Sequence, residues 1–171
     1  MGKSEFFKFN NFVIENKPMD YSGIMKQYQI VRRNPCVIIV PLCYDSFILV
    51  NEFRPAIEKN ILQFPAGKIE FGEEPIDSAI RELEEETGYI ADRISKIGEF
   101  YTAPHFSDEL IHVFSAECKQ MTKSSHTDRE KIVVEKIKCN EFPTLFNKNS
   151  LLDAKTLTAY SIWRMEHYGK I

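Results

Sequence analysis

The segment GKIEFGEEPIDSAIRELEEETGY, residues 67–89, contains the clearest helix signal in the chain. Proline is favoured in the first turn of a helix and glycine just past its end. Pro75 and Gly88 stand at those two positions, so the segment predicts a helix over residues 75–87. At 100° per residue, the face toward the core would carry Ile76, Ala79, Ile80, Leu83 and Thr87.

Three glutamates lie together on another side of this predicted helix. Glu82, Glu85 and Glu86 fall within about 100° of arc, at a spacing where like charges destabilise a helix. A solvated acidic face is one interpretation. Metal binding is favoured because hard divalent cations prefer crowded oxygen ligands, and because a glycine-containing segment, QFPAGKIEFG over residues 63–72, precedes the helix. In that segment we expect a strand end that turns through Gly67.

The charge of the chain is unevenly distributed. Residues 70–86 contain eight acids and one base, so this window carries −7, and the rest of a chain with net charge −3 carries +4. Such a cluster would repel a nucleic-acid backbone, which argues against DNA or RNA binding. The four cysteines lack C-x-x-C pairing, and we expect reduced, buried thiols. No apolar run approaches the roughly 20 residues of a membrane span, and residues 1–10 lack a secretory segment, so a cytoplasmic location is expected.

Short apolar runs alternate with turn signals along the other parts of the 171-residue chain. Strands are predicted within residues 6–14 and over 24–31, 36–42, 47–53, 97–102, 110–117 and 131–137, with a hairpin turn at 43–46. A second helix is predicted over residues 153–168, with Asp153 as its N-cap and Gly169 as its stop. This pattern predicts the α+β class, with an α/β/α sandwich around a mixed β-sheet and an N-terminal strand extension.

The spacing of residues 67–88 resembles a known family signature. Gly67, Glu73 and the run REL-EEE-TG at 81–88 match the box G-x5-E-x7-R-E-U-x-E-E-x-G-U of the Nudix hydrolases, where U is a bulky aliphatic residue. Tyr89 departs from the pattern at its last position. The resemblance implies a Nudix fold and chemistry at a diphosphate linkage, which leaves the substrate open.

The same resemblance assigns residues to metal binding. It implies that the backbone carbonyl of Ala66 and the side chains of Glu82 and Glu86 ligate two or three Mg²⁺ ions, with Mn²⁺ as the alternative metal. Glu85 would be a further ligand or a catalytic base. Arg81 would orient a neighbouring glutamate, and Gly67 would lie beside the substrate.

Segments outside the box resemble the ADP-ribose pyrophosphatase branch of the family. Residues 51–54, NEFR, are similar to its Q-[FY]-R segment with Glu52 in place of glutamine. Arg54 would then bind a phosphate, although an ordinary arginine at a strand end is the alternative. The terminal-helix pattern LLDAKTLTAY at residues 151–160 is also typical of this branch.

A loop segment, FYTAPHFSDE at residues 100–109, is similar to the marker segment of the same branch. Pro104 and Glu109 are therefore expected near the substrate. His105 replaces the usual glycine, and a surface role is favoured over a substrate contact. The branch also implies a water-activating carboxylate before the last strand. Here Glu130 would be a metal-linked glutamate and Asp128 the general base.

The expected reaction is Mg²⁺-dependent hydrolysis of ADP-ribose to AMP and ribose 5-phosphate. Two alternatives stay open: another nucleoside diphosphate sugar or an oxidised nucleotide as substrate, and a Nudix module that only binds its ligand. The family resemblance further implies a homodimer. The Phe-rich residues 1–31 would dimerise and extend the substrate site, and residues 32–171 would form the catalytic domain.

Overall fold

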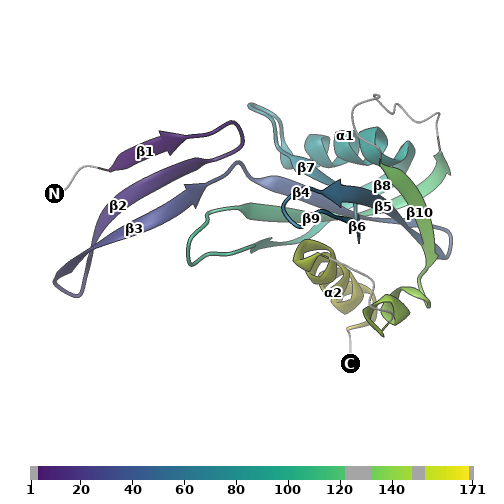
Figure 1. Ribbon diagram of the computed structural model, residues 1–171. Helices are drawn as coiled ribbons and strands as arrows, with labels where there is room; N and C mark the ends of the chain where they lie inside the picture. The colour runs from purple at the N-terminus through teal and green to yellow at the C-terminus, as the bar shows by residue number, and fades with distance from the viewer. Residues whose placement is uncertain (1–3, 122–131, 148–152, 170–171) are drawn as a thin grey trace.

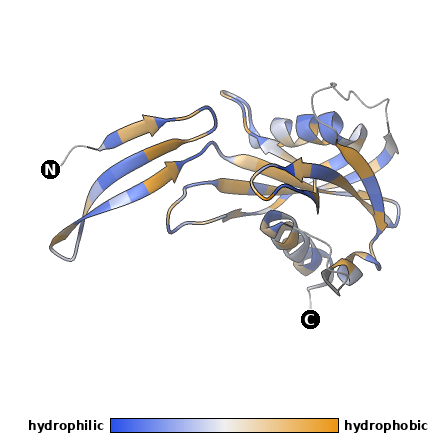
Figure 2. Cartoon of the chain, in the orientation of Figure 1, coloured by the Kyte–Doolittle hydropathy of each residue, from blue (hydrophilic) through white to orange (hydrophobic). Residues whose placement is uncertain are grey.

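The computed structural model describes residues 4–121, 132–147 and 153–169. Within these residues, an N-terminal sheet of three strands projects away from a larger sheet that is flanked by two helices (Figure 1). The N-terminal sheet is antiparallel and consists of β1 (Glu5–Lys8), β2 (Val13–Tyr21) and β3 (Ile24–Arg32). Hydrophobic stretches along these strands are visible in Figure 2.

The larger sheet is mixed. Its path among the described residues is β10 (Val133–Lys138), β5 (Ser46–Arg54), β4 (Cys36–Cys43), β9 (Leu110–Met121) and β8 (Tyr89–Tyr101), with β6 (Lys59–Gln63) on β5 and β7 (Ala66–Lys68) on β4. Strands β4 and β9 are parallel, whereas the other pairs are antiparallel. The predicted hairpin is confirmed, because Cys43 pairs with Ser46 across its turn.

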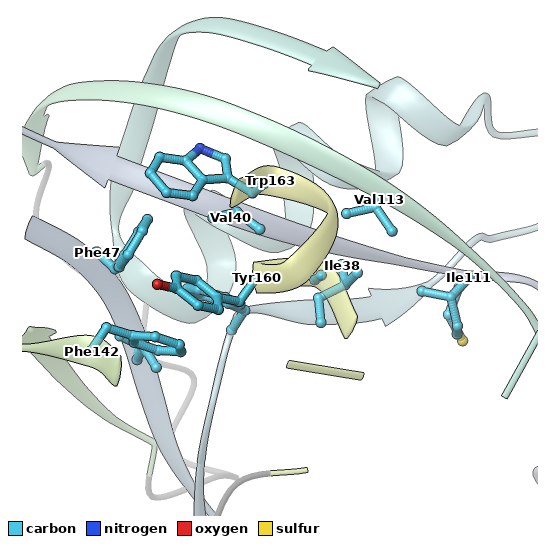
Figure 3. Packing of buried hydrophobic residues seen from close by; sticks show 12 residues of the cluster. Ile38, Val40, Phe47, Ile111, Val113, Phe142, Tyr160 and Trp163 are labelled. Atoms are coloured by element: carbon cyan, nitrogen blue, oxygen red, sulfur yellow. The ribbon is translucent and has the colours of Figure 1, made fainter. Parts of the chain in front are cut away.

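Strand β4 separates two hydrophobic cores. Its side chains alternate between the faces, and both faces are covered, which explains why its sequence is continuously apolar. Helix α2 (Ala154–Tyr168) and the short 3₁₀ helix η1 (Phe142–Asn147) cover one face, where Trp163 and Tyr160 pack on Phe47 (Figure 3). Helix α1 (Pro75–Thr87) covers the other. The predicted α/β/α sandwich is therefore confirmed.

Both predicted helices are present with the expected ends. Gly88 adopts a left-handed conformation with φ 70°, and its N–H donates to the Glu84 carbonyl at 2.8 Å. The Asp153 carboxylate accepts from the Thr156 N–H at 2.7 Å. None of the described helices is long and apolar enough to cross a bilayer.

Two residues predicted for the core face of α1 are exposed instead. Ile76 is 42% and Ile80 is 40% exposed, whereas Ala79 and Leu83 are fully buried. Ile76 lies in the first turn, next to an exposed loop, and Ile80 lies at the margin of the buried face. Ser78 was not predicted to be buried, yet it is completely buried. Its hydroxyl tolerates burial because it donates to Glu73.

Strand β8 is much longer than the predicted strand at residues 97–102. It begins at Tyr89, directly after α1, and pairs with β9 along its length. The register shifts near Ala91 and between Lys96 and Gly98 interrupt the two-residue alternation that reveals a strand in a sequence. A polar, bulged edge strand was therefore missed.

Candidate functional site

The site begins where β7 passes closely beneath α1. A Cβ atom added to Gly67 would lie 1.8 Å from Cδ of Glu82, which is far inside van der Waals contact. Gly67 itself lies within β7 and pairs with Val37 of β4, so the expected turn at Gly67 is wrong. Glycine is needed here because the Glu82 carboxylate occupies the space of a side chain.

Two glutamates of α1 pack against this strand, where burial disfavours their charged form. Glu86 accepts a hydrogen bond from the Ala66 N–H at 3.1 Å. Burial raises the pKa of Glu86 to about 8, and burial also raises the pKa of Glu82. A divalent cation would favour the charged form of both carboxylates, and Mg²⁺ requires only one or two of them because it keeps several waters. The residues present therefore fit the implied metal.

Arg81 organises the carboxylates around it. Its guanidinium donates to both oxygens of Glu73, at 2.9 and 3.0 Å, to Glu82 at 2.7 Å and to Glu85 at 3.2 Å. A further donation at 3.1 Å reaches the carbonyl of Lys68 and ties the helix to β7. The hydrogen bonds from Arg81, together with those from the Ser78 hydroxyl and the Glu70 N–H, lower the pKa of Glu73 to about 2. Arg81 therefore fixes Glu82 between β7 and the helix, as the orienting role requires.

A cleft of about 510 Å³ opens beside these residues. Its walls include four residues predicted for the site, namely Ala66, Gly67, Glu82 and Glu86, together with the predicted phosphate ligand Arg54. These residues come from β5, β7 and α1, so the sheet and the helix bring separate segments of the sequence to one surface. A volume of this size matches the range of small-molecule sites.

Arg54 is held in place by two neighbours. It donates to Glu52 at 2.9 Å and to Oε1 of the Gln63 side chain at 2.7 and 3.2 Å, and Nε2 of Gln63 donates to Glu52 at 2.8 Å. Gln63 is 2% exposed. The three side chains form a closed triangle on the cleft wall, and Glu52 balances the charge of Arg54.

Several predicted residues lie away from the cleft wall. Glu85 is on the outer side of α1, with a side chain that is 56% exposed and paired with Arg81. Pro104 and His105 are exposed in the loop between β8 and β9. Glu109 is buried behind the cleft. Asp128 and Glu130 lie outside the described residues.

No group of three or more acidic, histidine or cysteine side chains within the described segments is close enough to form a preassembled metal cage. Arg81 accounts for this arrangement at Glu82 and Glu85, because it holds both carboxylates by ion pairs. A metal site here would use Glu82, Glu86 and backbone or water oxygens.

Two basic residues of the cleft were not predicted. Arg33 follows β3, and Lys155 lies in the first turn of α2. The sequence pattern at residues 151–160 indicated the helix but gave no reason to single out its lysine. The signal is three-dimensional, because both side chains pair with Glu109, from a third segment.

Comparisons with known proteins identify the family of the chain. The model of the NUDIX domain matches residues 32–157, so the chain belongs to the Nudix hydrolase family. This family generally uses divalent metal ions.

Relatives within the family differ in substrate. The ADP-ribose pyrophosphatase of Bacillus subtilis is 38% identical over 144 residues, which cover 82% of this chain and 77% of the relative. A GDP-mannose pyrophosphatase of Cronobacter sakazakii is 27% identical over 173 residues, which cover 91% and 89%. A crystal structure of an ADP compounds hydrolase shares the fold, with a TM-score of 0.83 at 21% identity over 100% of this chain and 98% of that one.

Proposed function

We propose that this protein hydrolyses the diphosphate linkage of ADP-ribose, with water, to AMP and ribose 5-phosphate. The observation that carries the proposal is the cleft that Glu82, Glu86, Ala66 and Gly67 line together with Arg54. ADP-ribose is preferred as substrate because the Bacillus subtilis relative is named for it and is more similar than the GDP-mannose relative.

Different residues of the chain would have different roles in the reaction. Glu82 and Glu86 would hold Mg²⁺, with Mn²⁺ as the alternative and two or three ions in all, and Arg81 would keep Glu82 in position. When bound, the metal supplies charge neutralisation at the phosphates and a lowered pKa for a bound water. Asp128 is the proposed base that accepts the proton of the attacking water, with Glu85 as the alternative, and Glu130 is the proposed metal-linked glutamate.

A substrate panel tests this function directly. We expect Mg²⁺-dependent release of AMP from ADP-ribose, with a kcat/KM at least about tenfold above the values for GDP-mannose and UDP-glucose, a difference of about 1.4 kcal/mol. Removal of metal with EDTA should abolish turnover, and added Mg²⁺ should restore it. Faster cleavage of GDP-mannose, or of an oxidised nucleotide, would identify that compound and not ADP-ribose as the substrate. Tight binding of ADP-ribose with no turnover in Mg²⁺ or Mn²⁺ would favour a module that only binds its ligand.

We also propose that the protein is a homodimer joined through its N-terminal sheet. Large apolar side chains are exposed on this sheet, among them Phe6 (59%), Phe7 (50%), Ile24 (62%) and Met25 (59%). Patches of this kind on a projecting element mark interaction sites.

The oligomeric state provides the test of the dimer. Light scattering is expected to give twice the 19.9 kDa chain mass, and Phe7→Ser with Ile24→Ser should shift the protein toward monomer. Phe53→Ser, which changes an exposed side chain (54%) on the larger sheet, serves as the matched control. A wild-type monomer at micromolar concentration would contradict the proposal.

A further inference from the structure

A buried carboxylate behind the cleft holds two basic side chains. Glu109 is 6% exposed. It pairs with Nε of Arg33 at 3.0 Å and with Nζ of Lys155 at 3.3 Å, and it accepts from Oγ1 of Thr102 at 3.0 Å. The three donors come from the end of β3, the end of β8 and the start of α2, so Glu109 joins distant segments of the chain at one point.

The charges around Glu109 do not balance. Two cations share one carboxylate, whereas Arg54, elsewhere on the same wall, pairs with Glu52. Both Arg33 and Lys155 line the cleft, and their side chains are 34% and 30% exposed. Asp153 also lines the cleft, where its carboxylate caps α2 through the Thr156 N–H, so the attraction for an anion comes from the two partly exposed cationic side chains and not from a net positive wall.

The position of Lys155 does not stabilise its own helix. It lies in the first turn of α2, where the helix dipole disfavours a cation. Its ammonium carries three donors, and the pair with Glu109 uses one of them. The remaining donors can serve phosphate oxygens in the cleft, for which a compact ammonium group is suited.

We propose that Lys155 binds a phosphate of the substrate diphosphate, and that Glu109 is a positioning residue that holds Lys155 and Arg33 at the cleft. The inference rests on the proposed cleavage of a diphosphate but not on ADP-ribose as the substrate. Lys155 lines the same cleft as Glu82 and Glu86 but belongs to α2. It supplies a positive charge where those two residues supply carboxylates.

Binding of inorganic pyrophosphate to the metal-free protein in EDTA tests the role of Lys155. We expect Lys155→Met to weaken binding at least about tenfold, which corresponds to about 1.4 kcal/mol, and Lys155→Arg to retain most of it. The control is Lys119→Met, which removes an exposed lysine paired with Asp92 on the β8–β9 edge. In the metal-loaded enzyme, Lys155→Met should raise KM more than it lowers kcat. Wild-type affinity in Lys155→Met, or no binding to the wild-type protein, would overturn the proposal.

The positioning role of Glu109 predicts that loss of its charge weakens pyrophosphate binding, whereas simple electrostatics predicts that binding becomes stronger. Removing an acid beside an anion site should strengthen binding by Coulomb's law. If Glu109 positions the two cations, Glu109→Gln should instead weaken pyrophosphate binding while the protein stays folded. Tighter binding in this variant would overturn the role. Protection of Lys155 from reductive methylation by pyrophosphate, followed by mass spectrometry on the wild-type protein, gives a readout that needs no variant, and absence of protection would overturn the contact.

These measurements separate the two proposals. A wild-type protein that binds pyrophosphate through Lys155 but does not cleave ADP-ribose would refute the substrate and keep the phosphate contact. A protein that cleaves ADP-ribose, but in which Lys155→Met binds pyrophosphate normally, would keep the substrate and refute the phosphate contact.

Discussion

Replacing Gly67 by alanine is expected to lower kcat/KM for diphosphate hydrolysis at least about 100-fold, or about 2.7 kcal/mol. The added methyl would meet Cδ and both carboxylate oxygens of Glu82 at 1.8, 2.0 and 2.3 Å, so the carboxylate must leave its position. Displacement of a metal ligand or a positioning group by about 1 Å costs this much in other enzymes. Because the end of a flexible side chain can rotate away, the free energy of unfolding should change by only about 1 kcal/mol.

Steady-state kinetics together with urea unfolding measure both parts of this expectation. Gly98→Ala is the matched control, because its methyl would lie 3.2 Å from Cγ2 of Ile162, under α2 and away from the cleft. That variant should keep wild-type kinetics. Undiminished kcat/KM in Gly67→Ala would show that the position of Glu82 does not matter for the reaction.

Replacing Glu86 by glutamine is expected to lower Mg²⁺-dependent turnover at least about 1,000-fold, or about 4 kcal/mol, and yet to stabilise the metal-free protein above neutral pH. The amide preserves the shape of the side chain and can still accept from Ala66, but it cannot supply the charge that a cation requires.

The effect on stability follows from the raised pKa of Glu86. Burial raises this pKa from its ordinary value of 4.5 to about 8 in the folded, metal-free protein. The folded state then binds more protons than the unfolded state between these pH values, so stability falls as pH rises from about 4.5 to about 8. Glutamine does not titrate. Glu86→Gln should therefore exceed the wild-type protein in stability by roughly 1–3 kcal/mol at pH 8, and much less at pH 4.5.

Thermal unfolding in EDTA across this pH range measures the difference. Glu85→Gln is the control, because it removes a carboxylate from the same helix at a side chain that is 56% exposed. The fall in stability between about pH 4.5 and about pH 8 should persist in that variant, because Glu86 is unchanged. Addition of Mg²⁺ should stabilise the wild-type protein at pH 8 and have little effect on Glu86→Gln. Parallel pH profiles for wild type and Glu86→Gln would contradict the buried, high-pKa carboxylate.

The sequence was most informative where local signals and function coincide. Pro75 and Gly88 predicted helix α1 with its observed ends. The helical spacing grouped Glu82, Glu85 and Glu86 on one stripe; in the structure Glu82 and Glu86 meet β7, whereas Glu85 is exposed. Asp153 likewise marked the start of α2. These predictions depend on interactions within a few residues, such as a cap or a helical turn, which a sequence displays directly.

The features that were not predicted from the sequence depend on contacts between distant segments. Gly67 was interpreted as a turn residue, because nothing in the sequence shows that a carboxylate from 15 positions later would occupy the place of its side chain. Arg33 and Lys155 are 122 positions apart, and only folding brings both to Glu109. Strand β8 was shortened because its bulges conceal the alternation of an edge strand.

Strand β4 has a consequence for how the site can move. Every residue of β4 except Leu42 is buried, and Val37 and Ile38 pair with Gly67 and Ala66. A short strand fixed to the most protected part of the sheet opens only when the core around it opens. We therefore expect the amide protons of the backbone beside Glu82 and Glu86 to exchange slowly with solvent, and those of the exposed loop that carries Pro104 to exchange faster.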